Sequence, residues 1–234
     1  MIGIIIAIAV LVLAGIIICV LYHFGMLSFY HPMKKAKDNC IRVACVGDSI
    51  TYGLMVKNWS KHNYPYVLNK LLGENYCVNN FAYTNRTAIK SGDFPLVNEK
   101  VYKQSLEFKP NIVIILLGTN DSKANNWDKD KFINDYGEII DSYLRLDSSP
   151  KVYILTPPPL FEVRGKVLYK LRKPIVESEI IPAIENLVKA KGVDHIDVYK
   201  IFEGKKELFS DGVHPNVEGS KLLAQSVFEK LKDN

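Results

Sequence analysis

Four polar side chains, spread over three short runs of the 234-residue chain, are of the types that nucleophilic catalysis at a serine requires. Ser49 lies in the run GDSIT at 47–51, Asn120 in GTND at 118–121, and Asp211 and His214 in DGVHP at 211–215. An imidazole can take the proton of a serine hydroxyl, and a carboxylate bonded to its other nitrogen fixes the tautomer of the ring. An amide side chain can stabilise the oxyanion that forms on the attacked carbonyl. The four residues therefore predict a nucleophile, its base, the orienting acid and an oxyanion donor.

The segments between these runs alternate in type, and they determine where the four side chains can meet. Short apolar runs predict five strands, at 41–46, 76–81, 112–117, 152–155 and 193–198. Apolar residues at helical spacing predict five helices, at 64–72, 97–108, 132–144, 180–188 and 222–231. This alternation predicts an α/β fold, a three-layer αβα sandwich around a central, mostly parallel five-stranded sheet. GDSIT and GTND each follow a strand directly, and sites in such folds form at the carboxyl ends of strands.

Each run also has a purely structural interpretation, and the motifs of other chemistries are missing. GDSIT can cap a helix, and GTND and DGVHP can form turns. The sequence contains no GxSxG elbow, HExxH, P-loop, GxGxxG or metal-ligand cluster, so we expect neither a metal nor another cofactor. The net charge of +5 comes from scattered lysines without a nucleic-acid-binding motif, which argues against a nucleic-acid partner.

In their order and spacing, the three runs resemble sequence blocks of the GDSL/SGNH hydrolase family, and the resemblance covers residues 41–234. GDSIT is similar to the block that carries the nucleophile, here Ser49. GTND is similar to the block with the oxyanion-hole asparagine, here Asn120, and DGVHP to the block with the acid and base, here Asp211 and His214. The resemblance implies a flavodoxin-like sandwich and hydrolysis of carboxylic esters through an acyl-enzyme, without a cofactor.

One block of the family departs from its usual pattern in this chain. The family pattern resembles N-x-G-x-x-G-x-T, and an alignment on Thr87 puts Ala82 and Asn85 at the two glycine positions. The resemblance implies that the oxyanion is held by the backbone N–H groups of Ser49 and Asn85 and by the side chain of Asn120. The donor at position 85 is a main-chain amide, and asparagine tolerates the left-handed conformation better than most residues.

The expected substrate is a short-chain ester, most simply an acetyl group, on a carbohydrate. The stretch at 118–127 and the three prolines at 157–159 resemble family members that remove acetyl groups from carbohydrates. We take Asp48, Trp127 and Arg164 as candidate substrate contacts, although loop residues of these types also serve to pack loops. Two alternatives stay open. One is a lysophospholipase or thioesterase acting on lipid-like acyl esters, and the other is a membrane-tethered, non-catalytic binding module with a degenerate site.

The first 40 residues predict a membrane anchor and a linker, followed by the catalytic domain at 41–234. Residues 2–22 carry no charge and as a helix reach about 30 Å, the thickness of the hydrocarbon core of a bilayer. No Lys or Arg precedes this run and no A-x-A-like site follows it, which favours an uncleaved anchor over a signal peptide. The residues expected in an interfacial belt and a basic flank are His23, Phe24, Phe29, Tyr30, His31, Lys34, Lys35 and Lys37. The basic flank favours a cytoplasmic domain, whereas an extracellular substrate requires the opposite orientation, so the orientation stays open.

The four cysteines of the chain do not predict a disulfide framework. Cys19 lies in the apolar N-terminal run, and no CxxC pair exists. Cys45 and Cys77 lie in predicted strands, where we expect each to serve as a small buried hydrophobic residue.

Overall fold

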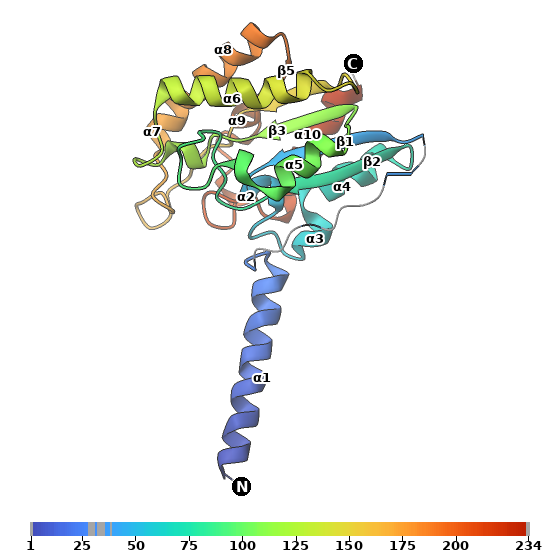
Figure 1. Ribbon diagram of the computed structural model, residues 1–234. Coiled ribbons are helices and arrows are strands. Elements are labelled where there is room, and N and C mark those ends of the chain that lie inside the picture. Colours follow the sequence, from blue (N-terminus) through green and yellow to red (C-terminus); the bar gives the residue numbers. More distant parts are fainter. Residues whose placement is uncertain (1, 28–30, 32–35, 38, 233–234) are drawn as a thin grey trace.

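The computed structural model describes residues 2–27, 31, 36–37 and 39–232, and a single long helix extends from a compact α/β body (Figure 1). Four residues of the predicted interfacial belt and basic flank lie outside the described residues, namely Phe29, Tyr30, Lys34 and Lys35. The division at residue 40 into an anchor with its linker and a catalytic domain stays a prediction.

Five parallel strands form one sheet in the order β2-β1-β3-β4-β5. Their bounds are β1 Ile41–Gly47, β2 Tyr76–Ala82, β3 Ile112–Leu116, β4 Lys151–Leu155 and β5 Asp194–Ile196. In this register Val46 of β1 lies beside Phe81 of β2 and Ile115 of the central strand β3. The predicted class and strand number are confirmed. The last strand is shorter than predicted, because Asp197 accepts a hydrogen bond from the N–H of Lys200 at 3.0 Å and starts a helix there.

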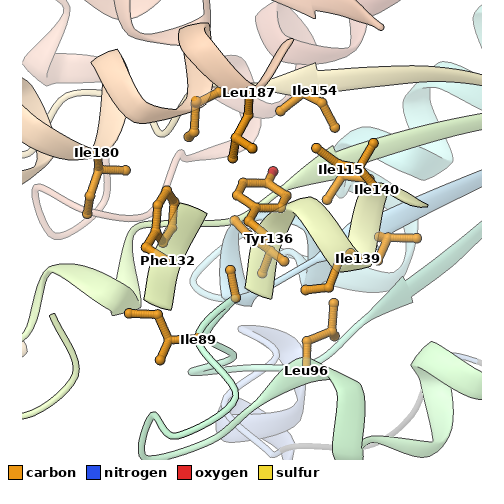
Figure 2. Close-up of a cluster of buried hydrophobic side chains, with 14 of the residues drawn as sticks. Ile89, Leu96, Ile115, Phe132, Tyr136, Ile139, Ile140, Ile154, Ile180 and Leu187 are labelled. Atoms are coloured by element: carbon orange, nitrogen blue, oxygen red, sulfur yellow. The ribbon is translucent and has the colours of Figure 1, made fainter. Parts of the chain in front are cut away.

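Helices cover both faces of the sheet and complete the predicted sandwich (Figure 1). The longer ones are α4 Tyr64–Leu72, α5 Lys100–Glu107, α6 Lys129–Leu144, α8 Ile181–Lys191 and α10 Val217–Lys232. Successive strand side chains point to opposite faces. Ile115 and Ile154 therefore pack with Phe132 and Tyr136 of α6 on one face (Figure 2). On the other face their strand neighbours, such as Ile114, pack with residues of α4 and α10.

Several short elements connect the strands to these helices. They are α2 Ser49–Tyr52, α3 Trp59–His62, α7 Lys173–Ile175, a π-helical turn at Val176–Ile180, α9 Val198–Phe202, and 3₁₀ turns at Leu96–Asn98, Asn120–Ser122 and Lys206–Leu208. The first of them, α2, is separated from the end of β1 by one residue and thus lies at the carboxyl end of an inner strand of the sheet. The sandwich thereby presents the residue that opens α2 at the edge where α/β folds form their sites.

Cys40 and Cys77 form a disulfide, so the expectation that Cys77 is only a buried hydrophobic residue is wrong. Cys40 directly precedes β1, Cys77 lies in β2, and their Cα atoms are 5.9 Å apart. The partners are separated by 37 residues and meet only because β1 and β2 are neighbours in the sheet. Spacing along the sequence therefore gave no signal of the pair. Cys45 is fully buried and unpaired, as expected.

Helix α1, Ile2–His23, is the one helix among the described residues that is long and apolar enough to cross a membrane. None of its stretch Ile6–His23 is buried against the rest of the protein. An N-terminal signal sequence has the same length and composition, so these properties alone fit an anchor and a signal sequence equally.

The chain that follows α1 packs against the short helices α2 and α3. Four residues form this contact: Gly25 and His31 from the chain after α1, Tyr52 from α2 and Trp59 from α3. The rings of Tyr52 and Trp59 stack with centroids 4.8 Å apart, and the His31 ring lies 4.9 Å from the first and 4.5 Å from the second. Gly25 has a φ of +66°, and a Cβ there would stand 3.0 Å from Trp59. Only glycine fits this left-handed, closely packed position without strain. We refer to these four residues as the docking cluster.

Candidate active site

Ser49, His214 and Asp211 meet in a hydrogen-bonded row at the carboxyl edge of the sheet. The Oγ atom of Ser49 lies 2.9 Å from Nε2 of His214, and Nδ1 of His214 lies 2.7 Å from Oδ2 of Asp211. The three residues are between 3 and 9% exposed, so the row is largely removed from water. We call this arrangement the Ser49–His214–Asp211 row.

The loop that carries Asp211 and His214 is folded around the carboxylate. Oδ1 of Asp211 accepts hydrogen bonds from the backbone N–H groups of Val213 at 3.0 Å and His214 at 2.8 Å. Gly212 has a φ of +81°, and a Cβ there would collide with the carbonyl oxygen of Phe161. Asp211 thus shapes the loop with one oxygen and leaves the other for the imidazole.

The state of Asp211 determines how the imidazole is bonded. Burial acts to raise the pKa of this carboxyl, but hydrogen bonds from His214 and from the hydroxyl of Tyr169 outweigh burial and hold its pKa well below the usual range. An ionised carboxylate only accepts hydrogen bonds. His214 therefore donates from Nδ1 and presents Nε2 as an acceptor for the hydroxyl of Ser49. The contact from Tyr169, at 2.7 Å, was not predicted from the sequence.

Asp48 is fully buried and bonds both to the helix that begins with Ser49 and to Asn120. Its Oδ1 accepts from the N–H of Ile50 at 2.9 Å and so caps α2, and its Oδ2 accepts from Nδ2 of Asn120 at 3.2 Å. Complete burial raises the pKa of Asp48 to about 6. Because its carboxylate is bonded to the N–H of Ile50, Asp48 fixes the start of the helix that begins with Ser49. Its predicted contact with substrate stays a prediction.

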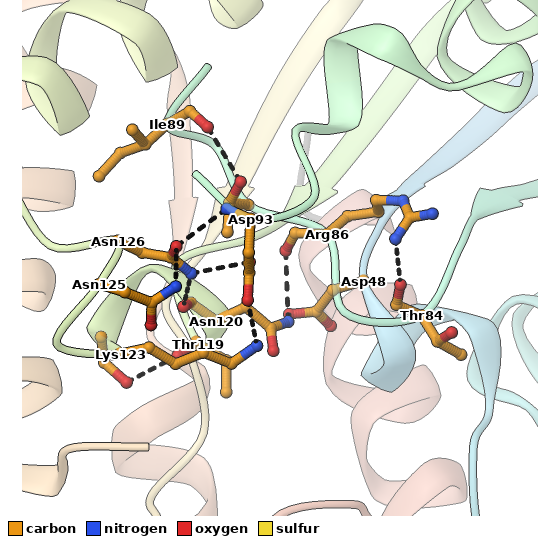
Figure 3. A network of polar contacts seen from close by, with 12 residues as sticks. Asp48, Thr84, Arg86, Ile89, Asp93, Thr119, Asn120, Lys123, Asn125 and Asn126 are labelled. Atoms are coloured by element: carbon orange, nitrogen blue, oxygen red, sulfur yellow. Dashed lines mark hydrogen bonds and ion pairs between the residues drawn. The ribbon is translucent and has the colours of Figure 1, made fainter. Parts of the chain in front are cut away.

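Asn120 joins the loops that follow three neighbouring strands. It follows β3, and its Nδ2 donates to Asp48 after β1 and to the carbonyl of Arg86 after β2, each at 3.2 Å (Figure 3). The backbone carbonyl of Asn120 accepts a hydrogen bond from Nδ2 of Asn126 at 3.0 Å. The amide of Asn120 is therefore buried and bonded to the residue that precedes Ser49, and both of its hydrogens point to acceptors within the protein. Its role as an oxyanion donor stays a prediction.

Asp121 fixes the loop that contains Asn85. Its two carboxylate oxygens accept from the N–H groups of Ala88 at 3.1 Å and Ile89 at 2.9 Å, and burial raises its pKa to about 7. Asn85 is exposed on this loop with a φ of +66°, the left-handed conformation expected at this position of the block. The sequence suggested only a turn-forming role for Asp121, because a clamp between two loops leaves no local pattern.

The other two candidate substrate contacts are Trp127 and Arg164, and neither is hydrogen-bonded to the Ser49–His214–Asp211 row among the described residues. Nε1 of Trp127 donates to Glu179 at 3.0 Å, and its ring packs on Phe132 with centroids 5.3 Å apart. Arg164 is exposed beside the bridge between residues 163 and 166, and it makes no hydrogen bond or ion pair with any residue that the structure describes. Trp127 is thus tied into the body, whereas the guanidinium of Arg164 is available to solvent.

An αβα sandwich with such a row at the carboxyl edge of its parallel sheet has the architecture of the SGNH-like α/β proteins. The chain belongs to the GDSL-like lipase/acylhydrolase family, whose sequence profile matches residues 45–222. An acetylxylan esterase of Xylanibacter ruminicola is 36% identical over 90% of this chain and 48% of its own length. The GDSL esterase/lipase WDL1 of Oryza sativa is 25% identical over 58% of this chain and 59% of its own length. The chain thus spans about half the length of the acetylxylan esterase.

Solved structures with low sequence identity share the fold. Est24, a carbohydrate acetylesterase from Sinorhizobium meliloti, superposes with a TM-score of 0.68 at 19% identity and covers 82% of this chain and 98% of its own. The aryl esterase of M. smegmatis superposes with a TM-score of 0.66 at 20% identity and the same coverage. These likenesses establish the SGNH-like fold of the chain.

Proposed function

We propose that the protein is a carboxylic ester hydrolase in which Ser49, His214 and Asp211 act as a catalytic triad. The observation that carries this proposal is the pair of hydrogen bonds in the Ser49–His214–Asp211 row, at 2.9 and 2.7 Å. These distances lie within the reach that proton transfer from a nucleophile to its base requires. Membership of the GDSL-like lipase/acylhydrolase family supports the same chemistry.

The proposed reaction is acyl transfer to water through an acyl-enzyme. Oγ of Ser49 attacks the ester carbonyl while its proton passes to Nε2 of His214, and the ionised Asp211 stabilises the imidazolium. The tetrahedral intermediate collapses, and the leaving alcohol takes the proton from Nε2. Water then attacks the acyl-enzyme by the same proton transfers in reverse, which releases the acid and restores Ser49.

The proposed oxyanion hole consists of the N–H groups of Ser49 and Asn85 and the side-chain amide of Asn120. The left-handed φ of Asn85 supports its assignment, since it gives the backbone the course that a glycine takes at this position of the block. The hydrogen bonds of Asn120 to Asp48 and Arg86 are both long, at 3.2 Å, so one can be shared with a stronger, negatively charged acceptor.

The proposed substrate is an acetyl ester on a carbohydrate, processed without a cofactor. The 36% identity to an acetylxylan esterase over 90% of this chain supports this choice. Of the three predicted substrate contacts, Arg164 has the exposure that a contact with a polar alcohol requires, whereas Asp48 is buried and the indole N–H of Trp127 is bonded to Glu179.

Rates with nitrophenyl esters of increasing acyl length, measured on the full chain in detergent, test the proposed function. We expect the acetyl ester to react fastest and Ser49→Ala to lower kcat on the order of a million-fold. The control Ser178→Ala changes an exposed serine on the π-helical turn, whose hydroxyl donates to the carbonyl of Pro174, and should keep full activity.

Each other outcome of this experiment identifies a different function. Activity that survives in Ser49→Ala overturns the nucleophile assignment. A preference for long acyl chains supports a lysophospholipase or thioesterase instead. Failure of an alkyl phosphonate to label Ser49 in the wild type supports a non-catalytic binding module.

We further propose that α1 anchors the protein in a membrane and that the α/β body faces an oxidising compartment. Disulfides such as Cys40–Cys77 persist in oxidising environments and are rare in the cytosol. The basic flank at 34–37 favours the opposite orientation by only a few charges. We give the disulfide more weight, because it is a covalent bond whose survival depends directly on the compartment.

A further inference from the structure

The hydroxyl of Tyr169 donates to Oδ2 of Asp211 at 2.7 Å, and the same oxygen accepts from Nδ1 of His214 at 2.7 Å. The ring of Tyr169 also meets the His214 ring edge-on, with centroids 5.4 Å apart. Tyr169 thus touches both members of the acid–base pair. We infer that Tyr169 is a positioning residue that sets how strongly Asp211 binds the imidazole of His214. The inference rests on the proposed triad.

The carboxylate of Asp211 is fully occupied by donors from the protein. Oδ1 accepts from two backbone N–H groups, those of Val213 and His214, and Oδ2 accepts from the imidazole and from Tyr169. A second donor on Oδ2 draws charge away from the bond to the imidazole, since two donors compete for one oxygen. Removal of the Tyr169 hydroxyl therefore leaves the imidazole as the one side-chain donor to Oδ2 among the described residues.

The ionisation states of Tyr169 and Asp211 agree with a hydrogen bond that Tyr169 donates and Asp211 accepts. Burial and the neighbouring Asp211 raise the pKa of Tyr169 well above its usual range, so the phenol keeps its proton. The titratable groups that face the imidazole are Asp211 on its own loop, Tyr169 on the segment after β4, and the buried Asp48 before α2. Of these, Tyr169 alone reaches the row from a partly exposed position, with 49% of its surface accessible.

The segment that carries Tyr169 is held at both ends, so the position of its hydroxyl is determined by the fold. At one end the N–H of Phe161 donates to the carbonyl of Gly212 at 2.8 Å, within the loop of Asp211. At the other end Leu171 is buried and the N–H of Arg172 donates to Oγ of Ser122 at 3.1 Å.

Between these attachments the backbone is strained at the residue of interest. Tyr169 and Lys170 both have a φ of +59°, a left-handed conformation that residues with a side chain seldom adopt. Such strain persists only where the surrounding contacts impose it, and it occurs preferentially at functional sites. The segment thus maintains an unfavourable backbone in the place where the Tyr169 hydroxyl reaches Asp211.

The substitution Tyr169→Phe removes the hydroxyl and keeps the ring against His214. With one donor fewer, Asp211 binds the imidazolium more strongly, so proton loss from the ring requires a higher pH. We expect the acid limb of the pH profile of kcat/KM for nitrophenyl acetate to move upward by about one unit. KM should stay unchanged, because Tyr169 contacts Asp211 and His214 and acts on the reaction only through them. If Tyr169 only packs against the site, the acid limb stays where it is in the wild type.

A second readout needs no activity. The proton on Nδ1 of His214, bonded to Asp211, gives a low-field resonance in proton NMR, and Tyr169→Phe should move it further downfield. The matched control Tyr199→Phe removes a phenol that donates to Glu177, away from the row, and should leave the resonance in place.

The two readouts separate the failure of this inference from the failure of the proposed function. An unmoved resonance in a Tyr169→Phe protein with a wild-type melting temperature overturns the positioning role. A resonance that moves in Tyr169→Phe, together with a wild-type protein that hydrolyses no ester, supports the positioning role and refutes the proposed function.

Discussion

Asp48 and Asn120 form the buried support on which the reacting serine depends. Asp48 holds the N-terminus of α2 through Ile50 and holds Asn120 through its second oxygen, and neither side chain is more than 5% exposed. Polar groups that are buried and fully bonded rigidify a site, whereas the loss of one partner leaves the other unsatisfied. The geometry of the oxyanion hole is therefore coupled to the geometry of the nucleophile.

The substitution Asn120→Ala tests this coupling. We expect kcat to fall about a hundred- to a thousand-fold, because one oxyanion donor is lost. The free energy of unfolding should also fall by about 1–3 kcal/mol, since buried acceptors at Asp48 and Arg86 lose their donor. Kinetics and thermal unfolding measure the two effects. Asn125→Ala, an exposed neighbour, is the control, and an unchanged kcat in Asn120→Ala removes this residue from the oxyanion hole.

Single residues of the site differ in how far the sequence predicts them. Ser49, Asn120 and the pair in DGVHP carry a local signal, because each belongs to a short run at a predicted strand end. Tyr169 carries none, since its place follows from two successive left-handed residues in a segment without regular structure. The clamp from Asp121 to the loop after β2 is likewise a contact between distant segments.

At the scale of elements, the docking cluster connects the end of α1 to the helix that carries the nucleophile. Ser49 opens the one-turn helix α2 and Tyr52 closes it, so the ring that stacks on Trp59 and contacts His31 belongs to the same turn as the reacting hydroxyl. The hydroxyl of Tyr52 also donates to the carbonyl of Leu27 at 3.1 Å. Residues before 41 thereby take part in fixing the position of α2.

The docking cluster predicts that stability depends on pH through His31. Burial lowers the pKa of His31 to about 4, although Nε2 of its ring donates a hydrogen bond to the carbonyl of Tyr52 at 2.9 Å. Between pH 6.5 and 4 the unfolded chain binds a proton at this residue and the folded protein does not. The free energy of unfolding should therefore fall as the pH drops through this window, by about 1–3 kcal/mol.

Chemical denaturation at pH 7 and pH 4.5, on the wild type and on His31→Phe, measures this dependence. The variant lacks the titrating ring, so its loss of stability over the window should be smaller. Asp48 and Asp121, whose raised pKa values act in the opposite sense, are common to both proteins and cancel in the difference. Equal losses in the two proteins would show that His31 is not buried against Tyr52 and Trp59.

The elements themselves were predicted to different degrees for a physical reason. Strands covered on both faces leave uninterrupted apolar runs, and long helices leave a periodic pattern, so β3 at 112–116 and α6 at 129–144 follow from the sequence. Helices α2, α3 and α9 have only four or five residues each, too few for a periodic pattern. Their boundaries depend instead on caps such as Asp48 and Asp197.

At the scale of the whole molecule, α1 and the disulfide place two constraints on the same part of the chain. The proposed anchor ends at His23, the docking cluster holds residues 25 and 31, and Cys40 closes the linker onto β2. The chain between the end of α1 and the start of β1 is thus attached to the α/β body at several points. Crosslinks of this kind stabilise mainly by restricting the unfolded chain, and a loop of 37 residues is expected to contribute about 2–4 kcal/mol.

The last prediction concerns the compartment that the α/β body faces, and the number of reactive thiols tests it. Alkylation of the denatured, unreduced protein should modify the two free cysteines, Cys19 and Cys45, and reduction should expose two more.

In right-side-out membrane vesicles, external protease should digest the α/β body, because the disulfide requires the oxidising side. Cys40→Ser should lower the melting temperature, whereas Cys19→Ser, within α1, should not. Four reactive thiols before reduction, together with a body protected from protease, would instead place the domain in the cytoplasm, as the basic flank favours.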